Sequence, residues 1–163
     1  MFALTLFFGF QATKLDPTDP AIYLQRHFDE EPSFFDQDQE DSHERKDFLK
    51  YYTAFCTVCQ MKIEKDTKHC ASCNRCTKGF DHHCFWLNNC IGHENYSDFI
   101  KATVFCCLYG LSTIALSIVF IKSILMYIFS ACCLLMSLGL FQLSLFHLYL
   151  WWKGISTFTY IKF

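Results

Sequence analysis

The apolar residues of this chain gather in its C-terminal third. Between Ala102 and Trp152 the only formal charge is Lys122. This stretch is more than twice as long as the ~20 apolar residues with which a helix crosses a bilayer. The pattern predicts two membrane helices, over residues 99–121 and 127–152, with a short turn near Lys122. Such a hairpin returns the chain to the side of the membrane from which it entered.

The N-terminal residues are a second apolar segment, but a shorter one. Residues 1–10 are almost wholly apolar, yet a helix of that length rises only about 15 Å, roughly half of the hydrocarbon core. The segment lacks the basic start and the small-residue cleavage site of a signal peptide. We therefore expect residues 1–15 to be the end of a membrane helix whose beginning is missing.

Between these apolar segments the chain is polar. The whole chain has a formal net charge of −2, but its acidic and basic residues are unevenly distributed. From Asp16 to Asp47 eleven acidic residues face three basic ones, and all three prolines of the chain fall here. Such a composition is typical of a solvated linker with at most short helices. The predicted organisation is an apolar segment over 1–15, an acidic linker over 16–49, a cysteine-rich domain over 50–98, two membrane helices over 99–152 and a short tail over 153–163.

The distribution of basic residues predicts how the chain lies in a membrane. Thirteen of the fourteen Lys and Arg residues lie outside the apolar hairpin, with Lys101 and Lys153 directly at its ends. The positive-inside rule then places the cysteine-rich region in the cytoplasm and Lys122 in the lumen. Thiols stay reduced in the cytosol, so closely spaced cysteines favour metal binding there. An extracellular disulfide-stapled module is the alternative, and an odd number of cysteines argues against it.

The cysteine-rich region holds seven cysteines and three histidines between Cys56 and Cys90. Two tetrahedral zinc sites of the Cys3His type need six cysteines and two histidines, so one residue of each kind is left over. The candidate spare cysteine lies in the run Asp81-His82-His83-Cys84. An imidazole can take the proton of a thiol, and a carboxylate can hold the imidazole in the right tautomer. The run therefore indicates a nucleophile with a base and an orienting group, a combination that suits thioester chemistry.

Cysteine-rich regions of this kind also have two other uses. Zinc can be purely structural, as in ring-type or ribbon-type interaction modules. Nucleic-acid binding is disfavoured, because the ligand spacing differs from a Cys2His2 finger and no basic run alternates with aromatic residues. We therefore expect no nucleic acid among the partners.

The whole pattern of cysteines and histidines resembles that of the DHHC-type zinc-finger protein S-acyltransferases, or palmitoyltransferases. It continues through Asn88-Asn89-Cys90-Ile91-Gly92 to Asn95-Tyr96. The resemblance covers residues 52–99 without a gap, and the chain is identified as a short or truncated member. Three departures stand out. Phe85 follows the nucleophile where many members have proline, and Thr159 replaces the glutamate of a Thr-Thr-x-Glu motif. The family generally has at least four membrane helices, whereas this chain offers two and half of a third.

The resemblance implies a mainly α-helical membrane protein, in which a transmembrane helical hairpin carries a small cytoplasmic module stabilised by two structural Zn²⁺ ions. The implied ligands are Cys56, Cys59, His69 and Cys76 for one ion and Cys70, Cys73, His83 and Cys90 for the other. The three residues that remain take the catalytic roles, with Asp81 as orienter, His82 as base and Cys84 as nucleophile.

The implied activity is transfer of a long-chain acyl group from palmitoyl-CoA, or another long-chain acyl-CoA, to cytoplasmic cysteines of membrane-associated proteins through an acyl-Cys84 intermediate. The expected location is the endoplasmic reticulum or Golgi membrane, as a multi-pass protein. The alternative is a weakly active or inactive truncated relative that acts as a zinc-dependent membrane interaction protein.

Overall fold

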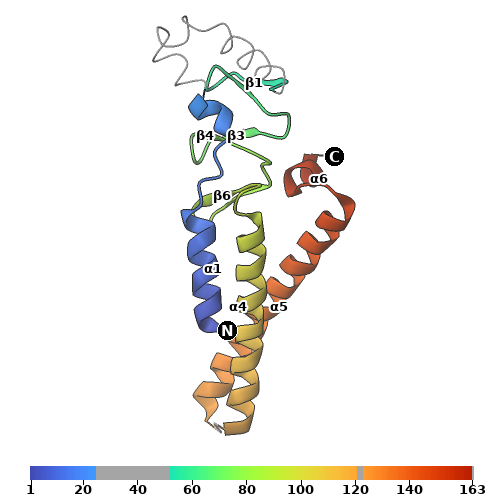
Figure 1. The fold of residues 1–163 in the computed structure, drawn as a ribbon. Coiled ribbons are helices and arrows are strands. Elements are labelled where there is room, and N and C mark those ends of the chain that lie inside the picture. The colour runs from blue at the N-terminus through green and yellow to red at the C-terminus, as the bar shows by residue number, and fades with distance from the viewer. Residues whose placement is uncertain (25–51, 121–122, 163) are drawn as a thin grey trace, which may run out of the picture. The chain divides into compact units, whose positions relative to one another are not determined.

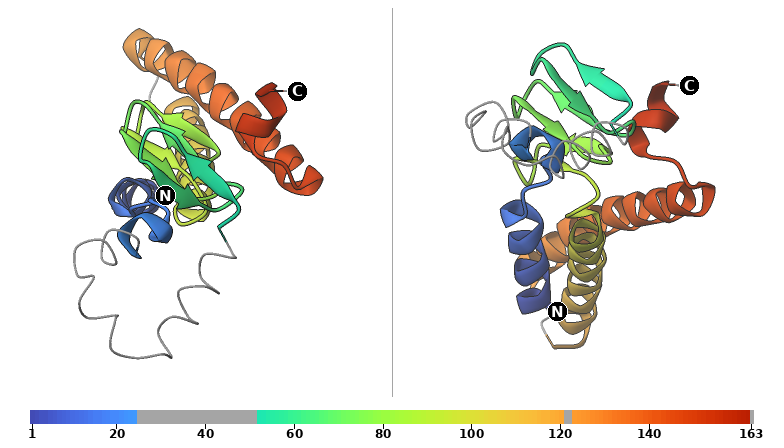
Figure 2. Two further views of the ribbon diagram at one scale, coloured as in Figure 1. Left: turned by 90° about the horizontal axis from the view of Figure 1, so that it is seen from above. Right: turned by 45° about the horizontal axis from the view of Figure 1, so that its top comes forward.

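The computed structural model describes residues 1–24, 52–120 and 123–162. The chain forms two compact units, shown in Figures 1 and 2. One unit is helical and consists of Met1–Leu15 and Asn95–Phe163, whereas Asp16–Glu94 form the cysteine-rich unit.

The helical unit contains α1 (Phe2–Lys14), α4 (Tyr96–Phe120), α5 (Ile124–Lys153) and α6 (Thr157–Lys162). Two of these helices are long and apolar enough to cross a membrane, over Tyr96–Val119 with mean hydropathy 2.0 and over Ile124–Lys153 with mean hydropathy 2.3. Both predicted membrane helices are thus confirmed, and each begins three residues earlier than expected, at 96 rather than 99 and at 124 rather than 127. The predicted turn residue Lys122 lies outside the described residues.

The ends of α5 have identifiable caps. The Ser123 side chain accepts a hydrogen bond from the backbone N–H of Met126, which satisfies one of the free donors of the first turn. At the other end Gly154 adopts a left-handed conformation with φ of 65°, and its N–H bonds to the carbonyl groups of Leu150 and Trp151. In the short helix that follows, the Ser156 hydroxyl accepts from the backbone N–H of Thr159. Thr159, which stands where the resembled family has a glutamate, therefore helps to form the first turn of α6.

Close packing joins α4 to α5. A Cβ atom built on Gly110 would collide with the hydroxyl of Ser137, so the absence of a side chain there allows the two helices to approach. At the N-terminal end of α4, the Tyr96 hydroxyl lies 3.0 Å from Nδ1 of the buried His147. The ring of Phe99 packs edge-on against the same histidine. The buried His147 of α5 is thus paired within the helical unit.

The N-terminal apolar segment forms α1, which lies beside α4. The Phe8 ring stacks on that of Phe105, with 5.5 Å between the ring centroids. Near the end of α1 the side-chain amide of the buried Asn95 donates to the carbonyl oxygen of Ala12 at 2.9 Å. Helix α1 is therefore attached to the residue that directly precedes α4.

The cysteine-rich unit contains three antiparallel hairpins, each with strands of three residues. They are β1–β2 (Ala54–Cys56, Met61–Ile63), β3–β4 (Lys68–Cys70, Arg75–Thr77) and β5–β6 (His82–Cys84, Asn89–Ile91). The apolar core is small and is formed by Ile22, Ile63 and two of the cysteines, Cys56 and Cys76. A core this small buries too little apolar area to fold a segment of this length by itself. In such small units bound metal commonly contributes the missing folding energy.

Part of the acidic segment packs into this unit. Residues 25–49 of the predicted linker lie outside the described residues, but the preceding residues join the second hairpin through a bridge between Thr18 and Thr77. The fully buried Asp19 carboxylate accepts hydrogen bonds from the Thr67 hydroxyl at 2.5 Å and from the backbone N–H groups of Glu64 and Ala21. Asp19 therefore connects its own segment to the loop between β2 and β3.

Candidate functional site

Strand geometry distributes the predicted ligands between two clusters. Successive side chains of a strand point to opposite faces, so neighbouring residues cannot serve the same site. His69 and Cys70 are neighbours in β3, and they belong to different clusters. Across the hairpin His69 pairs with Cys76, and in the third hairpin His83 pairs in the same way with Cys90.

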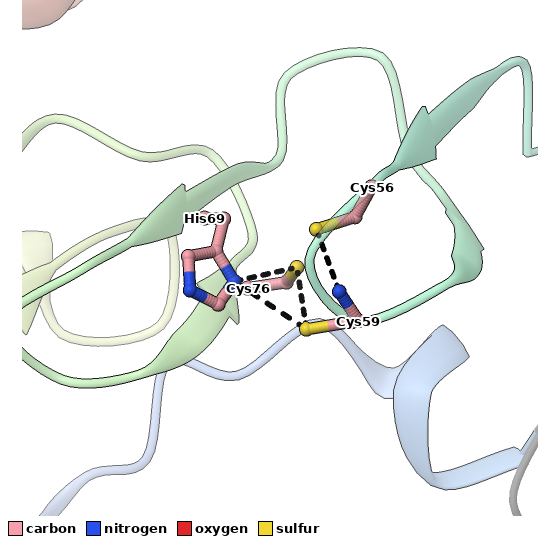
Figure 3. Close-up of side chains that lie close together, drawn as sticks. All are labelled: Cys56, Cys59, His69 and Cys76. Carbon is pink, nitrogen blue, oxygen red and sulfur yellow. Dashed lines mark hydrogen bonds between the residues drawn. The ribbon is translucent and has the colours of Figure 1, made fainter.

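The first cluster joins Cys56, Cys59, His69 and Cys76, whose ligand atoms all lie within 4.8 Å of one another. Figure 3 shows His69 presenting Nδ1 to the thiols. This nitrogen lies 3.4 Å from Cys59 Sγ and 3.8 Å from Cys76 Sγ, and the two sulfur atoms are 3.6 Å apart. The backbone N–H of Cys59 donates to Cys56 Sγ at 3.3 Å.

The second cluster joins Cys70, Cys73, His83 and Cys90 within the same limit. His83 Nδ1 lies 3.8 Å from Cys70 Sγ, 3.3 Å from Cys73 Sγ and 3.9 Å from Cys90 Sγ. The sulfur atoms of Cys73 and Cys90 are 3.3 Å apart. As in the first cluster, two thiols come from one hairpin, and a histidine and a third thiol come from the next.

Both clusters fit zinc. Zn–S bonds of about 2.3 Å and Zn–N bonds of about 2.0 Å place the ligand atoms of a tetrahedral site about 3.5–3.8 Å apart. The separations given above range from 3.3 to 3.9 Å, and all ligand atoms of a cluster lie within 4.8 Å of one another. Three thiols and an imidazole are also the donor set of structural zinc sites, and four protein ligands leave no position for a reacting water. The two clusters could therefore hold structural zinc.

The remaining three predicted residues also lie together. His82 and Cys84 are two positions apart in β5, so they share the face opposite His83. His82 Nδ1 lies 2.7 Å from Asp81 Oδ2, and the same imidazole hydrogen-bonds the Cys84 sulfur. Asp81 is almost fully buried, whereas the His82 side chain is 27% exposed. The order Asp81, His82, Cys84 is that of an orienting group, a base and a nucleophile.

The surroundings favour the charged forms of His82 and Cys84. Burial of His82 disfavours its cation, but the hydrogen bonds to Asp81 and Cys84 outweigh burial and raise the pKa of the imidazole to about 9. Burial raises the pKa of the Cys84 thiol, but the bond from His82 and those from the backbone N–H groups of Leu87 and Trp86 lower it overall. Both directions correspond to a thiolate paired with an imidazolium, the reactive state of a cysteine nucleophile.

Sequence reasoning missed the two backbone N–H groups that reach Cys84. Leu87 and Trp86 donate through the main chain, so the identity of their side chains gave no sign of the contact. The loop that contains them turns outward, with Phe85 and Trp86 exposed to 86% and 89%. Asn88, which follows, has φ of 46°, a left-handed conformation that asparagine tolerates better than most residues. A sequence signal did exist, because Cys56, Cys70 and Cys84 follow each other at equal intervals along the chain.

The helical unit contains an apolar cavity of about 580 Å³ between α4 and α5. Most of its lining is aliphatic or aromatic, and the polar groups among its walls include Lys101 and His147. The cavity is of the size that small-molecule sites have, and its apolar walls would suit an alkyl chain.

Comparison with known proteins agrees with the sequence resemblance. The family model described as DHHC palmitoyltransferase matches residues 49–130. The chain is 49% identical over 47 residues to the probable protein S-acyltransferase 20 of Arabidopsis thaliana, an alignment that covers 29% of this chain and 7% of the relative. It is 50% identical over 54 residues to the palmitoyltransferase SWF1 of Saccharomyces cerevisiae, covering 32% and 16%.

A third relative, the palmitoyltransferase ZDHHC15 of Xenopus laevis, is 44% identical over 59 residues, which cover 36% of this chain and 18% of the relative. The chain thus spans less than a fifth of the length of each of these three relatives. The family match covers the hairpins, both clusters and helix α4. With two helices long and apolar enough to cross a bilayer, the chain is a membrane protein and belongs to the DHHC palmitoyltransferase family.

Proposed function

We propose that this protein is a protein S-acyltransferase, which moves a palmitoyl or similar acyl group from acyl-CoA to cysteines of membrane-associated proteins. The observation that carries the proposal is the hydrogen-bonded trio Asp81, His82 and Cys84 on the strand face opposite the second cluster. Names of the matched relatives, palmitoyltransferase and protein S-acyltransferase, support the same reaction class.

In the first stage the Cys84 sulfur attacks the carbonyl carbon of the acyl-CoA thioester. His82 takes the thiol proton of Cys84, and Asp81 stabilises the imidazolium that forms. The bond from the acyl carbon to the Cys84 sulfur forms and its bond to the coenzyme A sulfur breaks. His82 returns the proton to the coenzyme A thiolate, so that free coenzyme A leaves.

In the second stage a cysteine of the protein substrate attacks the acyl-Cys84 thioester. His82 takes the proton of the attacking thiol, the bond between the acyl carbon and the Cys84 sulfur breaks, and the proton returns to Cys84. One thioester replaces another in each stage, so no oxidant, reductant or water is consumed. The raised pKa of His82 and the lowered pKa of Cys84 favour transfer of the Cys84 proton to His82, which reduces the reorganisation that the first stage needs.

The eight cluster residues are proposed as ligands of two structural Zn²⁺ ions. When bound, each ion would join one hairpin to the next through three thiolates and one imidazole. His83 and Cys90 belong to the hairpin that carries Cys84, so the second site would hold the nucleophile in place. The chemistry that zinc supplies is structural, because a site with four protein ligands has no open position.

The proposed orientation places the cysteine-rich unit in the cytoplasm. Lys101 lies in the first turns of α4 and Lys153 ends α5, so both apolar helices carry a cation at the same side of the predicted hairpin. An acyl-CoA presents a polar head to water while its tail partitions into hydrocarbon at ~0.8 kcal/mol per methylene. A cytoplasmic nucleophile beside the membrane suits such a donor. The endoplasmic reticulum or Golgi membrane remains the predicted compartment.

Acyl-enzyme formation tests the proposal directly. The purified full chain in detergent is incubated with an alkyne-tagged palmitoyl-CoA, and the label is detected after coupling to a fluorophore. We expect a label that hydroxylamine removes, as it cleaves thioesters, and that is lost in Cys84→Ser. Cys132→Ser, which removes the exposed cysteine of α5, is the matched control and should keep the label.

Transfer is then measured by adding a membrane-tethered peptide with one free cysteine. Passage of the label to this peptide, dependent on Cys84, would support the complete cycle. Equal labelling of the wild-type chain and Cys84→Ser would refute the role of Cys84. A chain that binds two zinc ions but forms no acyl-enzyme at high acyl-CoA would instead be a zinc-dependent membrane interaction protein.

A further inference from the structure

The three hairpins repeat one loop along the chain. The first strand of each hairpin ends at a cysteine, at Cys56, Cys70 and Cys84, and these positions follow each other at equal intervals in the sequence. The fourth residue after each cysteine has a positive φ, with 57° at Gln60, 49° at Asn74 and 46° at Asn88. The five residues from each cysteine to this turn residue are called a knuckle below.

The hydrogen bonds within the three knuckles also repeat. In the first knuckle the backbone N–H groups of Val58 and Cys59 donate to Cys56 Sγ. In the second knuckle the corresponding donors to Cys70 Sγ belong to Ser72 and Cys73. In the third knuckle the donors to Cys84 Sγ belong to Trp86 and Leu87. Each sulfur therefore receives the N–H groups of the second and third residues after its cysteine, the arrangement that Cys-x2-Cys zinc loops use to direct thiolates at one ion.

The knuckles differ at one position. The third residue after the first cysteine is Cys59 in the first knuckle and Cys73 in the second, and both belong to the candidate zinc clusters. In the third knuckle this residue is Leu87. All three side chains are half-buried, so the position has a similar environment in each hairpin.

Each candidate zinc cluster also needs the following hairpin. The first knuckle is completed by His69 and Cys76 of the second hairpin, and the second knuckle by His83 and Cys90 of the third. After β6 the described residues run into α4 rather than into a fourth hairpin. The third knuckle therefore lacks both its second thiol and the pair of ligands that a following hairpin would supply.

We propose that the third hairpin is a zinc knuckle turned into a nucleophile site, in which Leu87 replaces the second metal-binding cysteine and so keeps Cys84 free of metal. The proposal rests on the proposed function of Cys84. It adds a role for Leu87, which is to exclude metal from the Cys84 thiol. Leu87 contributes its main-chain N–H to the Cys84 sulfur, while its side chain offers no ligand atom. With a thiol at this position, His82 on the same strand face would complete a site with three ligands around the nucleophile.

The test is the substitution Leu87→Cys in the full chain, purified in detergent with a phosphine reductant. Phe85→Cys is the matched control, because it adds a thiol to the same loop at a spacing that is not Cys-x2-Cys. Zinc content is measured by elemental mass spectrometry, cobalt–thiolate absorption reports thiolate ligation, and acyl-enzyme formation is measured with tagged palmitoyl-CoA.

We expect Leu87→Cys to bind one more metal ion than the wild-type chain and to lose acyl-enzyme by about tenfold or more, because a thiolate bound to metal is a poor nucleophile. Phe85→Cys should keep the wild-type metal content and label. Adding Cys84→Ser to Leu87→Cys should remove the additional metal. An unchanged metal content in Leu87→Cys, or an additional metal with full Cys84 labelling, would overturn the proposal.

Two further results separate this proposal from the proposed function. Leu87→Ser offers no strong zinc ligand and should keep the wild-type metal content, so a gain of metal there would contradict the role of the cysteine spacing. If the wild-type chain formed no acyl-enzyme while Leu87→Cys still gained a metal ion through Cys84, the proposed acyl transfer would fail. The role of Leu87 in keeping Cys84 free of metal would stand.

Discussion

Replacing Asp81 by asparagine should slow acyl-enzyme formation without unfolding the cysteine-rich unit. The Asp81 carboxylate is almost fully buried, and its Oδ2 lies 2.7 Å from His82 Nδ1. Asparagine has nearly the same size and shape but carries no charge. The backbone bond from the N–H of Asp81 to the carbonyl oxygen of Ile91 is kept, because it does not involve the side chain.

The size of the effect follows from the hydrogen bond that is lost. A hydrogen bond to a charged group contributes about 1.5–3 kcal/mol, and each 1.36 kcal/mol of activation free energy corresponds to about tenfold in rate. The rise of the His82 pKa from 6.5 to about 9, caused by Asp81 and Cys84 together against burial, corresponds to about 3 kcal/mol. We therefore expect Asp81→Asn to slow acyl-enzyme formation by about 10- to 150-fold.

The assay is single-turnover labelling of the chain with tagged palmitoyl-CoA, followed by rapid quenching. Asp66→Asn, which changes an exposed carboxylate of the same unit, is the matched control and should label at the wild-type rate. Zinc content is measured on both variants, so that loss of the fold is distinguished from loss of rate. An Asp81→Asn chain that keeps its zinc and labels at a rate within twofold of wild type would refute the orienting role of this carboxylate.

Three further predictions concern stability and metal. Asp19→Ala leaves three donors, two of them in buried hydrogen bonds, without their acceptor and should lower the free energy of unfolding by about 3 kcal/mol, measured by chemical denaturation of the zinc-loaded chain; unchanged unfolding would contradict the connecting role of Asp19. Gly92→Ala places a Cβ 2.5 Å from the Lys78 carbonyl oxygen, and the forced backbone shift should cost about 1–3 kcal/mol in the same measurement; a neutral effect would show that the backbone adapts freely. Cys90→Ser removes a buried candidate ligand, so one of the two zinc ions and the Cys84 label should be lost together, and a variant that kept both would argue against the second site.

The helices could be predicted because length and hydropathy determine them, although their starts could not. Helix α4 begins with Tyr96, and its first turn contains Asp98, so the hydropathy pattern indicates only the part that lies beyond these polar residues. The strands were not predicted at all. Each has three residues, too few for an alternating pattern, and their positions depend on cysteine ligands rather than on apolar side chains.

The candidate site shows a similar division. The numbers of cysteines and histidines predict two sites and one spare residue of each kind, but counting cannot say which histidine is spare. The structure supplies a physical reason for taking His82, since this residue shares a strand face with Cys84 while His83 points to the other face. Acidic composition also concealed the buried position of Asp19, because a carboxylate that accepts three hydrogen bonds looks in sequence like any solvated charge.

The sharing of ligands between successive hairpins makes their stability unequal. The middle hairpin contributes to both clusters, the first hairpin only to one, and the nucleophile hairpin only to the other. Removal of the second metal would release the nucleophile hairpin while the first two hairpins stayed joined. If the two clusters hold zinc as proposed, partial loss of metal should therefore free the strand that carries Cys84 before the whole unit unfolds.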